Sequence, residues 1–254
     1  MNRLHHLQQT LPRNLKGNED YDDIEFIILD YNSTDGLDEW IRDTYSSLIQ
    51  EGRLVFFQEK TADHFYPSHS RNVSMRCASG DVVCNVDADN FTCSGFATFL
   101  YDFFSIDTKP RFANTYDMDL WKDTSTHGRI AMRRQHFFRI GGYDEKFIGW
   151  GSEDTDLTCR CINAGFERLE IPKKYFEVIG HGDDDRYGSI NFVEHTKDTL
   201  DESNYACSYI NSERLNWKRE NEFLVNNLGC CWGKAVLEKN FSETCELGSP
   251  WINL

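Results

Sequence analysis

The sequence lacks any long apolar run, and this absence excludes one class of protein at the outset. A membrane-spanning helix needs ~20 consecutive, predominantly apolar residues, and no stretch of the 254 residues approaches that pattern. The opening residues also lack the charged, apolar and small-residue regions of a signal peptide. We therefore expect no transmembrane segment in this chain and a cytoplasmic location, either free or peripheral to the inner face of a membrane, as for a bacterial-type enzyme.

Basic residues are also scarce. The chain has 27 Lys and Arg against 42 Asp and Glu, which gives a formal net charge of −15. Nucleic-acid-binding proteins usually carry a basic surface, so this balance argues against a nucleic-acid partner. Any other anionic ligand would need its charge to be neutralised locally, as a bound metal ion does.

Two further absences concern the organisation of the chain. It has no internal repeat and no tract rich in Pro or Gly that would divide it. Its nine Cys are odd in number and show no paired framework, so we expect reduced thiols. A chain of this length buries ~70–75% of the surface that its unfolded form exposes, which is enough for one enzyme-sized domain.

The apolar residues that are present recur with alternating periods of strand and helix. They predict an α/β fold with a mostly parallel central sheet flanked by helices, and ligands at the carboxyl ends of its strands. One predicted helix starts near Leu4, and the others cover 37–49, Ser68–Ser79, Gly95–Ile106 and 201–227. The predicted strands are Ile24–Leu29, Arg53–Gln58, Asp81–Val86, Arg129–Arg134 and Glu167–Gly180.

Asp87 and Asp89 directly follow the predicted strand Asp81–Val86. Residues i and i+2 of an extended chain point the same way, so both carboxylates are expected to converge on one point. Two like charges ~4 Å apart repel by ~4 kcal/mol at an effective dielectric of about 20, and a cation between them removes this cost. Oxygen ligands favour Mg²⁺ or Mn²⁺. The sequence therefore predicts a metal site, although such triplets also occur in solvated turns.

A second acidic motif, residues 141–157, leads into a predicted helix. It contains several glycines, and Ser152 can cap the helix. Glu153 and Asp154 then fall in the first turn, where the helix dipole favours ionised carboxylates. Trp150, between two glycines, is the candidate for stacking on a sugar ring. The motif indicates a sugar site with a catalytic base, and simple N-capping is the alternative.

Three motifs occur in order along the chain: FIILDYNSTDG at 26–36, the Asp87-Ala88-Asp89 triplet and GGYDEKFIGWGSEDTD at 141–156. Together they resemble those of GT-A fold glycosyltransferases of family 2. The third is especially similar to the GWGxED segment of β-1,4-galactosyltransferases. The resemblance runs from about Arg3 to about His181, and it implies the Rossmann-like GT-A fold, a UDP-sugar donor and Mn²⁺ or Mg²⁺ as cofactor.

The resemblance also implies a role for each donor-side residue. Asp30 would contact the nucleotide base, and Arg71 would reach the donor nucleotide or its phosphates. Asp87 and Asp89 would bind the metal and the ribose-diphosphate part of the donor. His181 would supply a further metal ligand.

On the acceptor side, Glu153 would hold an acceptor hydroxyl and Asp154 would deprotonate the attacking one. We therefore predict a metal-dependent, inverting, galactosyltransferase-like enzyme that moves a hexose or N-acetylhexosamine from a UDP-sugar to a glycan or glycolipid acceptor. One alternative is a catalytically impaired nucleotide-sugar-binding or scaffold protein of the same fold. Another is a metal-dependent phosphoesterase or nucleotidyltransferase, which would need a second metal site or a basic phosphate clamp.

The resemblance gives the predicted boundaries. A GT-A domain would cover 1–200, with a nucleotide-binding half (1–94) and an acceptor-side half (95–200), and 201–254 would form a helical extension packed on it. Family members carry a hydrophobic strand before their first helix, and the sequence shows no such strand. We therefore expect the sheet edge beside Ile24–Leu29 to expose unpaired backbone groups.

Glycosylation sequons begin at Asn32, Asn72, Asn90 and Asn240, and three of them lie against the predicted site. A glycan on Asn90 would obstruct Asp89. This favours a compartment without N-glycosylation, in agreement with the expected cytoplasmic location.

Overall fold

The structure is a computed structural model, and it describes residues 1–106, 109–115, 128–149, 151–180, 197–227 and 232–248. Its helices are α1 (Leu4–Gly17), α2 (Leu37–Gln50), α3 (Pro67–Cys77), α4 (Phe96–Ser105), α5 (Arg134–Arg139), α6 (Glu153–Asn163), the 3₁₀ helix η1 (Lys173–Tyr175) and α8 (Lys197–Glu220). Its strands are β1 (Phe26–Tyr31), β2 (Leu54–Glu59), β3 (Val82–Cys84), β4 (Asn90–Phe91), β5 (Arg111–Asn114), β6 (Ile130–Arg133), β7 (Glu167–Glu170), β8 (Glu177–Val178), β9 (Ala235–Lys239) and β10 (Glu243–Leu247).

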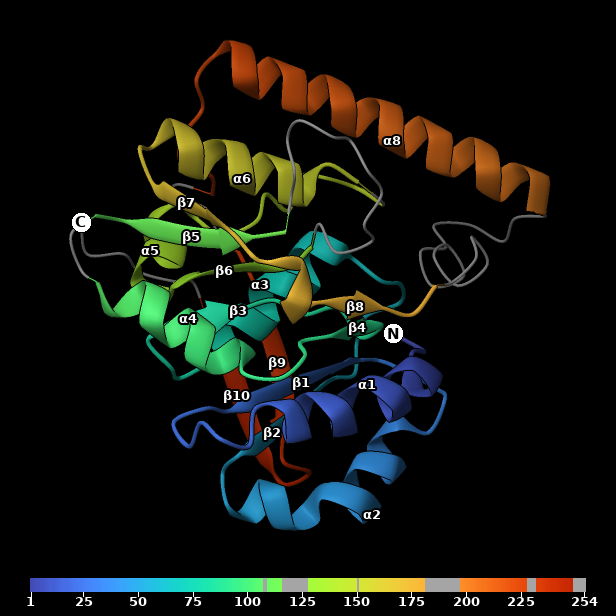
Figure 1. The fold of residues 1–254 in the computed structure, drawn as a ribbon. Helices are drawn as coiled ribbons and strands as arrows, with labels where there is room; N and C mark the ends of the chain where they lie inside the picture. Colours follow the sequence, from blue (N-terminus) through green and yellow to red (C-terminus); the bar gives the residue numbers. More distant parts are fainter. Residues whose placement is uncertain (107–108, 116–127, 150, 181–196, 228–231, 249–254) are drawn as a thin grey trace.

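The strands form two four-stranded sheets and one small pair (Figure 1). The first sheet has the order β1-β2-β9-β10, the second has the order β3-β6-β5-β7, and β4 pairs with β8. In Figure 1, α1 and α2 lie beside the first sheet, whereas α4, α6 and α8 lie around the second. The α/β class is therefore confirmed.

Strand pairing is mixed, whereas the sequence predicted a mostly parallel sheet. β1 pairs with β2 and β5 with β7 in parallel, and the pairs β2–β9, β9–β10, β3–β6 and β5–β6 are antiparallel. β1 and β3 nevertheless begin at the same end of the molecule. Glu25, just before β1, accepts hydrogen bonds from the backbone N–H groups of Ser79 and Gly80, just before β3, at 2.6 and 3.1 Å. Their carboxyl ends therefore lie at a common end as well.

Each sheet has its own apolar core. Around the first sheet, the buried side chains of Leu11, Ile41 and Phe56 join α1, α2 and β2. Around the second, helices α4, α5 and α6 pack against β5 and β6 through two further clusters. The predicted helices and strands of the first hundred residues agree with the structure to within about three residues, because apolar periodicity reports burial directly.

The predicted strand Glu167–Gly180 is wrong as a single element. Pro172, at φ −60°, begins η1 and separates β7 from β8. Proline fixes φ and has no N–H to donate to a sheet, so the chain turns there. β7 then pairs with β5 and β8 with β4.

The expected helical extension is correct only in part. α8 is helical, but β9 and β10 form a hairpin that continues the first sheet through β2. Asn240 and Phe241 turn the chain at φ 48° and 65°, the left-handed backbone of a tight hairpin turn. The Asn240 Oδ1 also accepts a hydrogen bond from the Phe56 N–H at 2.9 Å. Charged residues in AVLEK and ETCEL had hidden the strand alternation.

No helix in the described ranges combines the length and the apolar character that a membrane crossing requires. The predicted cytoplasmic location stays a prediction. The cysteines that the structure describes are free thiols, as predicted: Cys77, Cys84, Cys93, Cys159, Cys161 and Cys245.

Candidate active site

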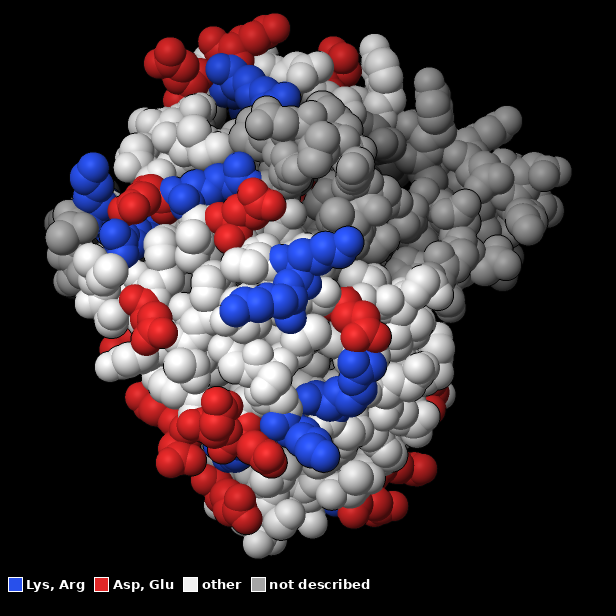
Figure 2. Space-filling model, in the orientation of Figure 1, with Lys and Arg blue, Asp and Glu red and all other residues white. Residues whose placement is uncertain are grey.

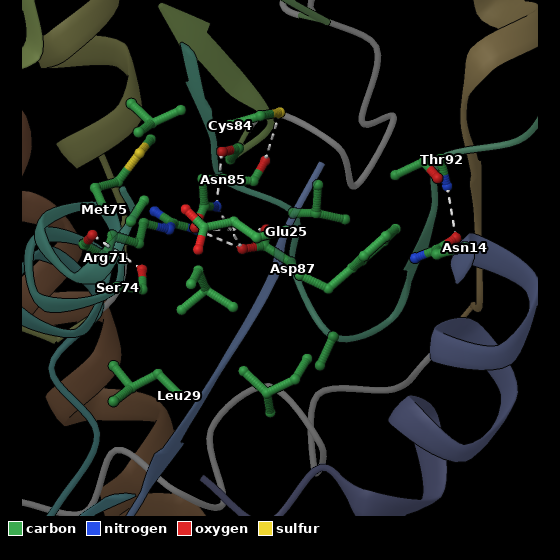
Figure 3. A pocket seen from close by; sticks show the side chains of 18 of the residues that line it. Asn14, Glu25, Leu29, Arg71, Ser74, Met75, Cys84, Asn85, Asp87 and Thr92 are labelled. Atoms are coloured by element: carbon green, nitrogen blue, oxygen red, sulfur yellow. Dashed lines mark hydrogen bonds and ion pairs between the residues drawn. The ribbon is translucent and has the colours of Figure 1, made fainter. Parts of the chain in front are cut away.

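A cavity of about 1170 Å³ extends between β1 and β3, and the close-up in Figure 3 looks into it. Predicted site residues line it where β3 reaches its carboxyl end, namely Arg71, Asp87, Asp89, Glu153 and Asp154. They come from α3, from the loop after β3 and from the first turn of α6. The fold therefore brings together most of the residues that the three sequence motifs singled out.

Arg71 joins two of these carboxylates. Its Nη1 donates to Glu153 Oε1, and its Nη2 donates to Asp87 Oδ1 at 3.3 Å. Burial alone would lower the pKa of the guanidinium, but the carboxylates of Asp87 and Glu153 raise that pKa well above its ordinary value. Arg71 also lies over the buried ring of Tyr143, 5.7 Å from its centroid. One cation thus links the loop after β3 to the start of α6.

The surroundings of Asp87 are closely fitted. Asn85 Nδ2 donates to Asp87 Oδ1 at 3.0 Å and to the Gly128 carbonyl at 2.9 Å. A Cβ atom at Gly128 would lie 2.5 Å from Asp87 Oδ2 and 2.6 Å from Arg71 Nη2, so any larger residue would have to displace the ends of these two side chains. Sequence reasoning missed Asn85, Gly128 and Tyr143. The one available signal for Asn85 was its place two residues before the Asp-x-Asp triplet.

The prediction that an extended strand directs the carboxylates of Asp87 and Asp89 to one point is wrong. β3 ends at Cys84, and the Asn90 N–H donates to the Asp87 carbonyl at 3.0 Å, which closes a turn over these residues. Asp89 Oδ1 accepts a hydrogen bond from Asn90 Nδ2 at 2.6 Å. Both carboxylates line the cavity, but a turn and not strand alternation brings them there.

The donor set of Asp87 and Asp89 fits a hard divalent cation, because Mg²⁺ and Mn²⁺ prefer carboxylate oxygens and keep positions for water and phosphate. The third expected ligand, His181, lies outside the described residues. Within the ranges that the structure describes, no group of three or more His, Cys, Asp or Glu side chains is arranged to hold a metal. The metal site therefore stays a prediction that rests on two carboxylates.

Asp30 lies at the end of β1 and is buried. Its Oδ1 accepts a hydrogen bond from the Ser33 N–H at 2.9 Å, and its Oδ2 accepts one from Gln58 Nε2 at 3.3 Å. The side chain thus braces the turn after β1. Its predicted contact with a nucleotide base stays a prediction, as does the predicted sugar contact of Trp150, which lies outside the described residues.

The first turn of α6 holds two carboxylates in different environments. Glu153 is 4% exposed, and burial together with the neighbouring Asp154 carboxylate raises its pKa to about 7, against the opposing effect of Arg71. Asp154 is half-buried on the cavity wall, and its Oδ1 accepts a hydrogen bond from the Thr155 N–H at 2.8 Å. We had expected the helix dipole to keep both ionised, but for Glu153 burial outweighs the dipole. Ser152 precedes the helix at φ 74°, and its hydroxyl makes no cap hydrogen bond.

Helix α8 holds the loop that leads into α6. Asn211, fully buried, donates through Nδ2 to the carbonyls of Ile148 and Gly151 at 2.8 and 3.0 Å. Its Oδ1 accepts a hydrogen bond from the Ile148 N–H at 3.2 Å. One amide side chain therefore fixes the backbone on both sides of residue 150.

A buried charge cluster continues this contact. Lys218 Nζ of α8 lies 3.2 Å from Asp144 Oδ2 and is also paired with Asp156. Asp144 is further paired with Arg214, and Asp156 with Arg160 at 2.8 Å. Burial alone would raise the pKa of Asp144, but Lys218 and Arg214 lower it below its ordinary range. Arg214 and Lys218 stand in a polar helix, so the sequence pattern gave no sign that they pair with buried carboxylates.

Basic and acidic side chains are mixed on one face of the molecule, and the predicted absence of a nucleic-acid partner stays a prediction. On the face in Figure 2, basic side chains are interspersed with acidic ones and form no continuous stripe among the atoms that are coloured. Such a stripe is the usual electrostatic footprint of nucleic-acid binding.

Two family models match the chain. The model for glycosyl transferase family 2 matches residues 1–104, and the model described as the N-terminal domain of galactosyltransferase matches residues 110–184. Human β-1,4-galactosyltransferase 4 is 31% identical over 88 residues, which are 35% of this chain. This match spans 20% of the length of that relative.

Two solved structures resemble the fold at low sequence identity. GalNAc-T7 with UDP, GalNAc and Mn²⁺ has a TM-score of 0.54 at 15% identity, over 87% of this chain and 53% of that chain. Drosophila β1,4-galactosyltransferase 7, in complex with manganese, UDP-Gal and xylobiose, has a TM-score of 0.44 at 17% identity, over 70% and 79%. The first of these likenesses bears on the fold. The chain thus shares the GT-A fold of GalNAc-T7, and it is similar to family 2 glycosyl transferases over residues 1–104 and to galactosyltransferases over residues 110–184.

Proposed function

We propose that the protein is an inverting glycosyltransferase that moves a hexose or N-acetylhexosamine from a UDP-sugar to a hydroxyl of a glycan or glycolipid. The observation that carries the proposal is the convergence of Asp87, Arg71, Glu153 and Asp154 on one cavity at the carboxyl end of β3. The matched family models and the GalNAc-T7 structure, which holds UDP, GalNAc and Mn²⁺, support the same class of donor.

In the proposed reaction, Asp154 accepts the proton of the acceptor hydroxyl. That oxygen bonds to the anomeric carbon as the bond from this carbon to the diphosphate oxygen breaks, so UDP leaves and the configuration inverts. Glu153 orients the acceptor hydroxyl, and Arg71 keeps Glu153 and Asp87 in place. Asp87 and Asp89 would hold Mn²⁺ or Mg²⁺, which supplies Lewis-acid stabilisation of charge on the diphosphate when bound.

The test is a donor panel scored by UDP release, with and without an acceptor mixture, together with calorimetric titration of UDP in Mn²⁺. Asp154→Asn should lower turnover by ~10²–10⁴ and barely change UDP affinity, because only the proton acceptor is removed. Asp89→Ala should abolish metal-dependent UDP binding. Asp102→Asn, on an exposed position of α4, is the matched control and should leave both measurements unchanged. Parental turnover in Asp154→Asn would eliminate that residue as the base.

One observation favours the alternative of a nucleotide-sugar-binding protein without turnover. Asp87, expected to serve the donor and metal, is already engaged by Arg71 and Asn85. Metal-dependent UDP binding without UDP-sugar hydrolysis or transfer, for every donor of the panel, would select this alternative.

A further inference from the structure

The turn that carries Asp87 and Asp89 is hydrogen-bonded at each of its backbone carbonyls. The carbonyls of residues 87–91 accept hydrogen bonds at 2.7–3.0 Å from five different groups, in this order: the Asn90 N–H, Thr10 Oγ1, the Ile179 N–H, Asn14 Nδ2 and Arg129 Nη2. A turn whose carbonyls all have partners would lose hydrogen bonds in any other conformation, so it is held in this one. Two of the donors, Thr10 and Asn14, belong to α1, a helix that lies outside the three sequence motifs.

One side of α1 is polar although it is buried. Thr10, Asn14 and Asn18, the last just after the helix, follow at intervals of four residues, which bring side chains to the same side of a helix. They are 1%, 8% and 1% exposed. Asn14 Oδ1 accepts a hydrogen bond from the Thr92 N–H at 2.8 Å, the contact drawn in Figure 3, and Asn18 Oδ1 accepts one from the Ala97 N–H at 2.8 Å. The polar side of α1 therefore binds the backbone that follows the Asp-x-Asp triplet.

Thr10 makes the contact that lies between the two predicted metal ligands. Its Oγ1 is 2.7 Å from the Ala88 carbonyl oxygen and 3.3 Å from the carbonyl oxygen of His6, one turn earlier in α1. A hydroxyl has one hydrogen to donate, and the shorter distance assigns it to Ala88. The Ala88 carbonyl belongs to the peptide group that joins Ala88 to Asp89. Its direction therefore sets how the Asp89 side chain lies relative to that of Asp87.

We propose that Thr10 is a positioning residue for the divalent metal ion of the donor site: its hydroxyl holds the peptide between Ala88 and Asp89, and this sets the spacing of the Asp87 and Asp89 carboxylates. The inference rests on the proposed function, which assigns these two carboxylates to Mn²⁺ or Mg²⁺. A hydroxyl that binds a backbone carbonyl adds no charge to the site, so Thr10 acts on geometry alone, whereas Arg71 also supplies charge to Asp87. Groups that orient metal ligands typically contribute ~10–100-fold to metal affinity.

The predicted metal site depends on this spacing more than a site with many protein ligands would. Within the described ranges, no third His, Cys, Asp or Glu is arranged with the two carboxylates to hold a metal. Mg²⁺ demands near-ideal octahedral geometry and keeps several waters, so a shift of one carboxylate removes a large part of what the protein contributes. The contacts of the turn are made by protein groups, so we expect the spacing to be set before the metal binds.

The experiment measures UDP binding by calorimetry in excess Mn²⁺ and again in EDTA, for the parent chain and three variants. Thr10→Val keeps the shape of the side chain and removes the hydroxyl, and it should raise the Kd for UDP in Mn²⁺ by about tenfold. Thr10→Ser keeps the hydroxyl and should restore the parental Kd. Asn18→Ala is the matched control: it removes buried hydrogen bonds on the same side of α1, to Ala97 and Thr92, and should lower the melting temperature without changing the Kd. UDP binding in EDTA should be the same in all of these proteins.

A Kd for Thr10→Val equal to that of the parent would overturn the proposal. An equal rise of the Kd in Asn18→Ala would overturn it as well, because the effect would then come from a general loosening of α1. A parent chain without metal-dependent UDP binding would contradict the proposed function itself, and the role of Thr10 would fall with it. The parent measurement therefore separates the failure of the proposed function from the failure of this inference alone.

A second measurement needs no variant. Without UDP and Mn²⁺, the amides of Asn90 and Ile179, which donate to the Asp87 and Asp89 carbonyls, should already exchange slowly, because the turn is held in advance. Adding UDP and Mn²⁺ should change their exchange little. Slowing by about tenfold or more on addition would show that the ligand orders the turn, and this would overturn the role of Thr10.

Discussion

The two walls of the cavity are built in opposite ways. The wall formed by α6 and its loop is fixed by directional contacts, namely the Arg71 bridge, the Asn211 amide and the buried pairs of Lys218. The wall formed by β1 and β3 presents apolar side chains, and in the described part of the chain one edge of each strand has no neighbouring strand. The comparison shows that side-chain contacts around α6 hold the acidic groups in place, although β1 and β3 belong to two separate sheets.

The difference has an energetic consequence. On the wall formed by α6 and its loop, removing one partner leaves a buried charge or amide uncompensated. Single side-chain deletions there should therefore lower the free energy of unfolding. On the apolar wall, there is unfilled space, so single additions should stabilise the protein. The predictions below test this asymmetry from the largest expected effect to the smallest.

Lys218→Ala should lower the free energy of unfolding by ~3–5 kcal/mol, because it leaves Asp144 and Asp156 close together and short of one cation. The measurement is urea denaturation at neutral pH. Glu213→Ala, on an exposed position of the same helix, is the control and should change stability by at most ~0.5 kcal/mol. A loss below ~1 kcal/mol for Lys218→Ala would show that the charge cluster is not a main constraint on this wall.

The free energy of unfolding should decrease as the pH rises from about 5 to about 8, because of Glu153. Its pKa is raised from 4.5 to about 7 in the folded protein, so the folded state binds more protons than the unfolded state in that interval. This contribution is fully present below pH ~4.5 and is lost as the pH rises through ~7, by an amount on the order of 3 kcal/mol. Glu153→Gln should remove the slope between pH 5 and pH 8 in urea titrations. A parent protein whose Glu153-dependent stability rises over this range would contradict the assignment.

Asn211→Ala should cost ~1–3 kcal/mol, because the backbone groups of Ile148 and Gly151 lose their partner in a buried site. Asn221→Ala provides the comparison, since the Asn221 amide makes an exposed hydrogen bond to the Trp217 carbonyl. Thermal melts of both variants should therefore separate clearly. Equal melting temperatures would mean that the loop before α6 does not depend on α8.

The smallest expected effect is a gain on the apolar wall. Ser74→Leu places additional methyl groups in the cavity and should stabilise the protein by about 1 kcal/mol. Thr158→Val in α6, on the opposite wall, should instead destabilise the protein by ~1 kcal/mol, because the buried Asn114 amide loses its Thr158 acceptor. Effects of the same sign in the two variants would remove the asymmetry between the walls.

The predictable part of the fold is the part with apolar periodicity. Leu11 and Ile41 follow helical spacing, and they lie in the core of the first sheet. The site residues converge because β1 and β3 end at a common side and α6 begins there. The hairpin of β9 and β10 was missed because only Leu237 of β9 is buried, so its charged neighbours dominate the pattern.

Other features depend on contacts that no local pattern carries. Lys218 and Asp144 are far apart in sequence, and a single Lys in a polar helix reads as solvated. The pKa of Glu153 depends on burial beneath surrounding segments, which outweighs the local helix dipole. The turn that aims Asp89 follows from a hydrogen bond between the Asn90 N–H and the Asp87 carbonyl, and an Asp-x-Asp triplet does not specify it.

The pairing of β2 with β9 can form only late in synthesis, because β9 lies near the end of the sequence. Phe56 and Asn240 are hydrogen-bonded although 184 residues separate them. At a ribosomal rate of about 5–20 residues per second, ~10–40 s pass between the emergence of these two residues. During that interval the edge of β2 stays open to other strands, so the nascent chain is most exposed to mispairing before its final hairpin arrives. Translation speed between α2 and β9 is therefore a variable on which the yield of folded protein should depend.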